Sequence, residues 1–342
     1  MIESCIRQIK LFLGWYIRHH GQPESLLEIF PSKERQGVTS VFSFIKWLHS
    51  SRRVSSAYEA SMIRGLIKFA KFRYSNESQS GDLSRSYDDI PAIKELRKLH
   101  RDTNKGQKNS ARVSNEELKW ISWPEYLNVI ETLGKDLRLL LEELREKKAP
   151  ECRRRAIAST YQKYLVLSML AAVPDRQRTF RELSLGTTFV KHGDAWVIKH
   201  GPLDYKTGSS YGDRPPLPIP QSLTTAIDDW IENFRPTFKP VGDHLFVQPR
   251  TGNQLTGDGM YKIVSKTVFQ YTGKKTNPHL LRDMVVTHAR DGSATEKELE
   301  ALALYMGHSI AMQRNSYDRR TLKQKVAPAI DLLHSISKSG MK

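Results

Sequence analysis

The first 75 residues carry apolar side chains at the spacing of a helix face. Three stripes recur at that spacing: Ile6, Ile9, Leu13 and Ile17; Val41, Phe44, Ile45 and Leu48; Ile63, Leu66, Ile67 and Ala70. Apolar residues with a helical period mark the buried face of an amphipathic helix. Residues 1–75 are therefore expected to form an all-helical domain in which the stripes pack into a core.

The pattern is lost between residues 76 and 114. The segment SNESQSGDLSRSYDD is polar and rich in Gly and Ser, which is typical of a loop or hinge. PAIKELRKLHR is compatible with a short helix, whereas RDTNKGQKNSARVSN has no apolar stripe and predicts an extended basic stretch. We therefore expect a basic linker over 76–114, with the domain boundary near residue 110.

Residues 115–342 return to helical periodicity with one interruption. Ser114 followed by Glu117 has the spacing of a capping box and predicts a helix start. Between 184 and 220 the pattern changes to short strands joined by Gly-containing turns, in TTFVKHGDAWVIKH and LDYKTGSSYGDRPPLPIP. Helical patterns occupy 124–145, 155–172, 221–234, 256–270, 279–290, 296–305 and 325–337. This domain is expected to be mainly α with a small β-sheet, an α+β fold.

The composition indicates which class of partner the chain binds. Hydrophobic residues make up 39% of the 342 residues, which is enough for packed cores, and 54 Lys and Arg against 37 Asp and Glu give a net charge of +17. An excess of that size attracts polyanions, nucleic acid first. No stretch approaches the roughly 18 consecutive apolar residues of a membrane span. Cys5 and Cys152 are far apart and form neither a disulfide framework nor a zinc knuckle, so we expect a reducing, cytoplasmic setting.

The segment MGHSIAMQRNSYDRR, residues 306–320, contains a tyrosine in polar, basic surroundings. His308 and Tyr317 stand nine residues apart, and little apolar periodicity accompanies them. A tyrosine in such a segment can be a packing residue, a stacking platform or a nucleophile. The choice depends on which other residues accompany it.

A second candidate pair is His279 and Arg282, directly after Pro278. Positions i and i+3 share a helix face, so the imidazole and the guanidinium are expected to face one anionic oxygen. Alone this spacing is weak evidence, because about one such pair arises by chance. His49 and Arg52 form another in the N-terminal region.

Six residues together define the candidate site. Two cations lie upstream of the C-terminal segment: one in AAVPDRQRTFREL after an apolar helix, the other in YKTG within the predicted β-hairpin. In chain order the six are Arg176, Lys206, His279, Arg282, His308 and Tyr317. Such a set, without paired carboxylates or a metal cluster, favours phosphoryl transfer by charge and protons. A dispersed DNA-contact surface is the alternative.

These residues give the chain a resemblance to the tyrosine recombinases, the phage-integrase family of site-specific DNA recombinases. NPHLLRDMVVTHA resembles the family's H-x-L-R box, and LALYMGHSIAMQRNSY resembles its L-G-H-S…Y box with the same interval from His to Tyr. The resemblance is specific over roughly 115–325. It is weaker over 1–75, where only the helical texture and FIKWL resemble the family's core-binding domain.

The resemblance implies a role for each candidate residue. Tyr317 would attack a scissile phosphate and form a 3′-phosphotyrosyl bond. Lys206 would protonate the departing 5′-hydroxyl, and His279 would assist proton transfer to or from the tyrosine. Two arginines would hold the non-bridging phosphate oxygens and His308 would hydrogen-bond the phosphate; the arginines are Arg176 and Arg282. Neither metal, ATP nor another cofactor is implied.

The resemblance also implies partners and an assembly. The partner would be double-stranded DNA, held in a C-shaped clamp of the core-binding and catalytic domains with the basic segment 98–115 crossing the duplex. The active form would be a homo-tetramer on paired DNA sites in a nucleoid-associated protein, serving DNA integration, excision or transposition. The helix at 325–337 would dock on a neighbouring protomer or fold back on its own domain. A type IB topoisomerase and a catalytically inactive DNA-binding accessory protein are the alternative functions.

Two assignments depart from the family pattern. The first arginine usually follows a T-G-L-like turn with Glu three residues later, but here the turn reads VPDR and Thr179 occupies the Glu position. Alignment on Leu183 and Leu185 would instead select Arg178; we favour Arg176, because the preceding apolar helix and turn then correspond.

The lysine has a rival as well. Lys199, in the preceding predicted strand, competes with Lys206, and the KTG turn favours Lys206.

Overall fold

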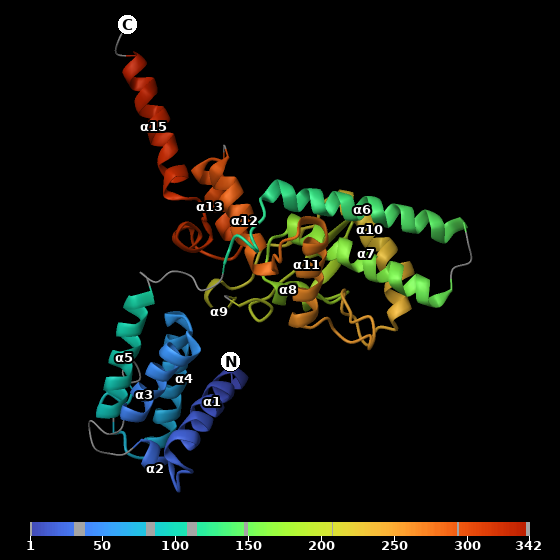
Figure 1. The fold of residues 1–342 in the computed structure, drawn as a ribbon. Helices are drawn as coiled ribbons and strands as arrows, with labels where there is room; N and C mark the ends of the chain where they lie inside the picture. Colours follow the sequence, from blue (N-terminus) through green and yellow to red (C-terminus); the bar gives the residue numbers. More distant parts are fainter. Residues whose placement is uncertain are drawn as a thin grey trace. The chain divides into compact units, whose positions relative to one another are not determined.

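The computed structural model describes residues 2–30, 38–79, 86–107, 115–146, 150–206, 208–292 and 294–339. The chain divides into two compact units, Met1–Asn115 and Glu116–Lys342 (Figure 1), and each is described by itself. Within the described residues, no helix is both long enough and apolar enough to cross a bilayer.

The N-terminal unit is all-helical, as its stripes predict. Its helices are α1 (Ile2–His20), α2 (Leu26–Ile29), α3 (Thr39–Arg52), α4 (Ser56–Arg73) and α5 (Pro91–Gln107). The predicted stripes of α3 and α4 face the core, with Ile67 only partly buried. On α1 the predicted face is only partly correct: Leu13 packs against the core, but Ile6 and Ile17 are exposed, and Phe12 and Trp15 are the buried residues. Edge-on and tilted ring contacts of Phe12 and Trp15 with Phe44 explain the choice, because aromatic rings bury more area than isoleucine.

The short helix expected at PAIKELRKLHR is present, but it continues to Gln107, through part of the stretch predicted to be extended. Residues 91–107 form α5, which packs along α4. Its apolar face consists of few residues, with Ile93 and Leu96 fully buried in the same core as α3 and α4. Lys, Arg and Glu have high helix propensity, so a narrow apolar stripe suffices to hold this charged helix. The remaining parts of the linker, 80–85 and 108–114, lie outside the described residues.

The first helix of the second unit begins eight residues later than its sequence signal predicts. Ser114 lies outside the described residues, and residues 117–119 form a turn rather than a helix. The first helix is α6 (Trp123–Glu146), and its capping box is formed by Ser122 and Glu125. The Ser122 hydroxyl accepts from the Glu125 N–H (3.3 Å), and the Glu125 carboxylate accepts from the Ser122 N–H (2.6 Å).

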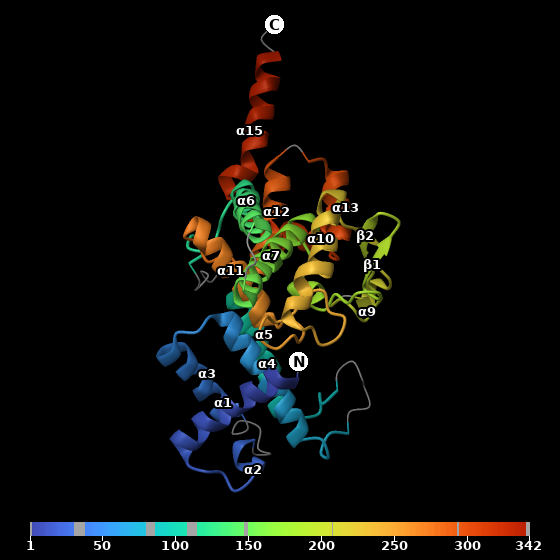
Figure 2. The same ribbon diagram turned by 90° about the vertical axis from the view of Figure 1, so that its right-hand side faces the viewer.

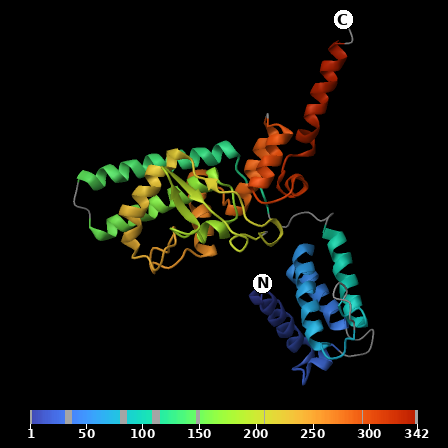
Figure 3. The same cartoon turned by 180° about the vertical axis from the view of Figure 1, so that it is seen from behind.

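Four long helices frame the core of this unit. They are α6, α7 (Glu151–Ala172), α11 (Gly257–Thr272) and α12 (Pro278–Asp291), and α6 and α7 lie side by side (Figures 1 and 3). Helix α7 is buried on several sides, with Ile157, Leu165 and Met169 inside the core. The remaining helical elements are α8 (Gln177–Arg181), α9 (Gly208–Tyr211), η2 (Gln221–Leu223), α10 (Thr224–Asp229), η3 (Trp230–Phe234), η4 (Arg235–Phe238), α13 (Glu296–Tyr305), α14 (Ile310–Met312), η5 (Gln313–Tyr317) and α15 (Leu322–Ser339).

A three-stranded antiparallel sheet interrupts the helices, so the unit has the predicted α+β character. The strands β1 (Phe189–His192), β2 (Ala195–Ile198) and β3 (Leu217–Pro218) lie in chain order, with β1 and β2 visible in Figure 2. The expected strand around Lys206 is absent from the described part: residues 202–206 form turns before α9. The Asp204 carboxylate accepts from the Gly201 N–H (2.8 Å), which closes a turn.

Helix α15 follows the last candidate residue and presents an apolar stripe to solvent. The stripe consists of Leu322, Val326, Ile330, Leu333 and Ile336, each between 44% and 78% exposed. A row of five exposed apolar side chains at helical spacing is typical of a contact surface.

Candidate active site

One cavity of about 380 Å³ collects most of the predicted site residues. Arg176 from the N-cap of α8, Lys206 from the loop after β2, His279 from α12, His308 from the turn after α13 and Tyr317 from η5 all line it. These positions span more than 140 residues of sequence, so the cavity is a product of the tertiary fold.

Arg282 lies beneath this cavity and is only 1% exposed. Its Nη1 donates to the carbonyl oxygen of Pro174 (2.6 Å), and its Nη2 donates to that of Met306 (2.9 Å). The same Nη2 lies 3.5 Å from the Tyr317 hydroxyl. Burial lowers the pKa of Arg282, and its Nε has no hydrogen-bond partner among the described residues. A buried guanidinium with an open donor favours an anion beside the tyrosine oxygen.

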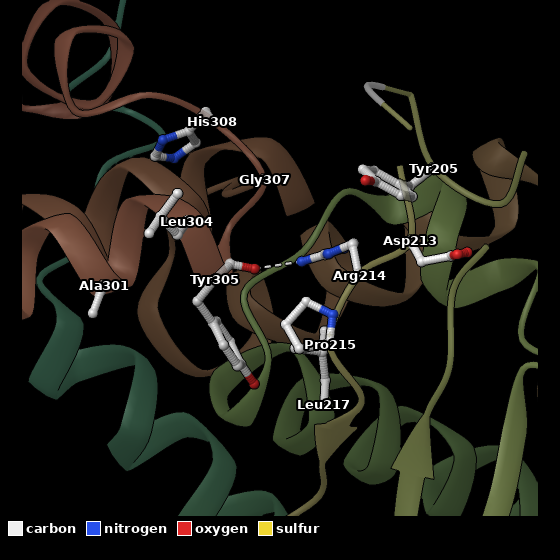
Figure 4. A pocket seen from close by; sticks show the side chains of 10 residues that line it. All are labelled: Tyr205, Asp213, Arg214, Pro215, Leu217, Ala301, Leu304, Tyr305, Gly307 and His308. Carbon is white, nitrogen blue, oxygen red and sulfur yellow. Dashed lines mark hydrogen bonds between the residues drawn. The ribbon is translucent and has the colours of Figure 1, made fainter. Parts of the chain in front are cut away.

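A buried carboxylate holds the arginines in place. Asp175 is 2% exposed, accepts from the backbone N–H of Arg176 (2.7 Å) and pairs with Arg214 and with Arg282 (3.4 Å). Burial opposes ionisation of Asp175, but the two guanidiniums hold its pKa below the ordinary value. Arg214 also donates to the carbonyl oxygen of Tyr305 (Figure 4). Sequence reasoning missed Asp175 and Arg214; the only local signal was the position of Asp175 directly before Arg176.

Tyr317 ends the π-helical turn η5, and its ring contacts two imidazoles. It stacks on His308 with 4.6 Å between ring centroids and meets His279 edge-on at 6.3 Å. Gln313, at the start of η5, is fully buried and donates to the carbonyl oxygen of Leu299 (3.1 Å). Single π-helical turns are frequent at functional sites. Here the turn delivers the phenol to the cavity while its first residue anchors the segment in the core.

The basic residues after Tyr317 serve the fold. Arg319 donates from Nε to Asp283 (2.8 Å) and from its backbone N–H to the Thr287 hydroxyl (3.0 Å). Arg320 pairs with Asp318 (3.0 Å). These guanidiniums are therefore engaged in ion pairs within the unit, although the sequence made them look like the environment of the phenol.

Both histidines of the cavity favour the neutral form. Burial, and then the charges of Arg282 and Arg176, lower the pKa of His308 to about 4. Burial followed by the charges of Arg282, Arg176 and Lys206 lowers the pKa of His279. The His308 Nδ1 faces the carbonyl oxygen of Ser309 at 3.3 Å, and its Nε2 has no partner among the described residues. A neutral imidazole with an open nitrogen can accept or pass on a proton.

The two cations that line the cavity, half-buried Arg176 and exposed Lys206, are open to a ligand. No ion pair involving the side chain of Arg176 or Lys206 occurs among the described residues. Thr179, which occupies the family's Glu position, donates its hydroxyl to the carbonyl oxygen of Arg176 (2.6 Å) and thereby fixes that backbone. By contrast, Arg178 is exposed and pairs with Glu182 (2.8 Å), away from the residues that line the cavity.

Other candidates from the sequence lie elsewhere. Lys199 directly follows β2, is exposed and does not belong to the cavity lining. In the N-terminal unit, His49 pairs with the buried Glu59 (3.0 Å), and Arg52 stacks over Trp47. Over the described ranges, no group of three His, Cys, Asp or Glu side chains is arranged to hold a metal ion.

Comparison with known proteins finds similarity among solved structures. No protein-family model and no curated protein matches the chain. The crystal structure of XerA recombinase is similar with a TM-score of 0.42 and 13% identity, over 96% of this chain and 91% of that one. A similarity of this extent carries no conclusion about the site, whose chemistry is argued from its own residues.

Proposed function

We propose that this protein cleaves and rejoins DNA strands by phosphoryl transfer to Tyr317, as a site-specific recombinase or integrase. One observation carries the proposal: the Tyr317 hydroxyl lies 3.5 Å from the buried Arg282 guanidinium, in a cavity that Arg176, Lys206, His279 and His308 also line. A phenol is a weak nucleophile while it holds its proton, and its use requires cations at the electrophile and a proton acceptor close by. This cavity offers both.

The proposed step balances in atoms and charge. The Tyr317 oxygen forms a bond to phosphorus, the bond from phosphorus to the 5′-oxygen breaks, and the product is a 3′-phosphotyrosyl link with a free 5′-hydroxyl. Arg176 and Arg282 would neutralise the non-bridging oxygens of the five-coordinate phosphorus. His279 would take the phenol proton, and Lys206 would give a proton to the leaving oxygen. The link retains the energy of the phosphodiester, so attack by a 5′-hydroxyl reverses the step.

Duplex DNA is the proposed partner of both units. The net charge of +17 supports attraction to phosphates along a duplex. In the N-terminal unit, Lys10, Arg18 and Arg52 line one shallow cavity together with Trp47, and Arg52 lies 5.3 Å from the Trp47 ring centroid. Cations interleaved with aromatic rings suit backbone contact and stacking in nucleic-acid recognition. In the proposed complex the two units clamp the duplex between them.

Assembly into a tetramer on paired DNA sites is the second part of the proposal. The exposed apolar stripe of α15 supports it, because burial of these side chains against another copy would stabilise the assembly. Integration, excision and transposition are the outcomes that such an assembly would serve.

The experiment is covalent trapping on nicked DNA. The protein is incubated with duplexes from the flanks of its gene, each carrying a nick that lets a short 5′-hydroxyl fragment diffuse away, and the products are separated on a denaturing gel. We expect an adduct that peptide mass spectrometry maps to Tyr317. Tyr317→Phe should abolish the adduct and retain DNA binding, while the matched control Tyr261→Phe, on the exposed face of α11, should form it normally.

Each other outcome has a defined meaning. An adduct that survives in Tyr317→Phe would refute the nucleophile. Adduct formation with plasmid relaxation and no recombinant product would point to a topoisomerase. Salt-sensitive binding without any covalent species, on every DNA tried, would point to an inactive DNA-binding protein.

A further inference from the structure

The loop between β2 and β3, residues 199–216, carries Lys206 and is tied to the rest of the site by one buried side chain. Arg214 is near the end of this loop, and its side chain is only 6% exposed. Its guanidinium pairs with Asp175 and donates to the carbonyl oxygen of Tyr305 (Figure 4). Asp175 precedes Arg176, and Tyr305 lies three residues before His308. A single guanidinium therefore joins the three segments that carry Lys206, Arg176 and His308.

Tyr205 connects Arg214 to Lys206, because it contacts Arg214 and directly precedes the lysine. The Tyr205 ring is buried and lies 5.1 Å from the Arg214 guanidinium. Its hydroxyl donates to the carbonyl oxygen of Gly212 (2.7 Å), and the Arg214 N–H donates to that of His200 (3.2 Å). The residue directly before Lys206 is thus held at its hydroxyl by Gly212 and over its ring by Arg214, and the lysine side chain has a defined starting point.

The loop that carries Lys206 is closed on itself, so a change at Arg214 is expected to move it as one piece. A Cβ added at Gly208 would lie 2.0 Å from the carbonyl oxygen of Pro202. The backbone on the two sides of Lys206 is therefore in direct contact. Removing the Arg214 anchor leaves this closed loop held by its own short-range hydrogen bonds, free to shift as a body relative to Arg176 and Tyr317.

We infer that Arg214 is a positioning residue that sets where Lys206 presents its ammonium to the leaving 5′-oxygen; the inference rests on the proposed function. Arg214 does not belong to the lining of the 380 Å³ cavity and acts through Tyr205 and the loop. Its pairing with Asp175 also steadies Arg176, so the experiment has to separate an effect on the leaving group from an effect on phosphate binding.

A change of leaving group makes that separation. Two duplexes are prepared with either oxygen or sulfur as the bridging 5′-atom, at the cleavage position that the covalent adduct maps. A 5′-thiolate leaves without being protonated, because a thiol has a pKa near 8.5 and an alcohol is far less acidic. Loss of the proton donor therefore slows cleavage of the oxygen duplex and spares the sulfur duplex.

Three variants calibrate the measurement of single-turnover cleavage, and Arg214→Met is the variant under test. Lys206→Ala defines the loss of the proton donor, and Arg176→Ala defines the loss of phosphate binding, which should slow both duplexes. Arg153→Met removes an arginine from an exposed ion pair with Glu143 and is the matched control. Arg214→Met should cleave the oxygen duplex at least tenfold more slowly than wild type and recover most of that loss on sulfur.

The outcomes separate the inference from the proposed function. An Arg214→Met protein that is equally slow on both duplexes, as Arg176→Ala is, would overturn the inference and leave the proposed function intact. Wild-type protein that forms no adduct in the mapping experiment, so that no cleavage position is found, would refute both. If Arg214→Met does not fold by circular dichroism, the same comparison is made with Arg214→Lys, which keeps a buried charge beside Asp175 and lacks the fork that reaches Tyr305.

Discussion

Asp175→Asn tests the buried charge cluster that underlies the cavity. Asn has nearly the volume of Asp and can still accept from the Arg176 N–H, so the substitution removes charge with little change in packing. What is lost is the counter-charge to Arg214, whose side chain is 6% exposed, and to Arg282, which is 1% exposed. Breaking a buried pair by removing one partner costs about 3–5 kcal/mol, because it leaves a charge uncompensated.

The expected result is a large fall in thermal stability of the second unit. In a domain of 150–250 residues each kcal/mol shifts Tm by roughly 2–4 °C, so Asp175→Asn should lower Tm by about 6–20 °C. Differential scanning calorimetry of the full chain measures it. The control is Glu296→Gln, which breaks the exposed pair with Arg314 and should cost no more than about 1 kcal/mol.

The pH dependence supplies a second check. The folded-state pKa of Asp175 lies below its unfolded value, so its contribution is present above the unfolded value and is lost as the pH falls through the folded pKa. The difference in stability between wild type and Asp175→Asn should therefore be constant from pH 8 to 5 and shrink only in stronger acid. A Tm within about 2 °C of wild type at pH 7 would refute the reasoning.

Three further predictions concern separate features. Gly208→Ala should cost about 1–3 kcal/mol in urea unfolding, because its Cβ meets the Pro202 carbonyl oxygen; unchanged stability would contradict the close contact. His308 has a folded pKa of about 4 against 6.5 unfolded, so the unfolded chain binds more protons between these values and stability rises with pH. His308→Gln should flatten that rise by about 3 kcal/mol between pH 4 and 7, and parallel curves would argue against a buried neutral His308. Ile330→Asp should abolish assembly on DNA in light scattering and leave adduct formation intact, whereas unaltered assembly would remove α15 from the interface.

The sequence predicted those parts of the site that depend on residues close together in the chain. Helix α12 starts where Asn277 caps it and Pro278 opens it, and the spacing of His279 and Arg282 follows from the helix. The spacing does not predict how deeply each side chain is buried. His279 lines the cavity, whereas Arg282 lies beneath it and its guanidinium donates to backbone carbonyl oxygens. The carbonyls come from segments that no periodicity connects to α12.

Long-range pairs account for what the sequence left out. Asp175 and Arg214 are 39 positions apart and meet because the turn before α8 and the end of the β2–β3 loop pack together. Each alone looks like one charged residue among many. The misjudged elements have a related cause, since α5 and the buried face of α1 depend on which neighbouring helix covers them rather than on their own composition.

Helix α12 also anchors the segment that joins Tyr317 to α15. Asp283, Thr287 and Arg290 lie on successive turns of α12 and receive Arg319 and Arg320, with the Arg320 Nη1 donating to the carbonyl oxygen of Arg290 (2.6 Å). A displacement of α15 would therefore first strain the contacts of Arg319 and Arg320 with α12, before it affected Tyr317. We therefore expect these contacts to limit how far a displacement of α15 moves the Tyr317 oxygen away from Arg282.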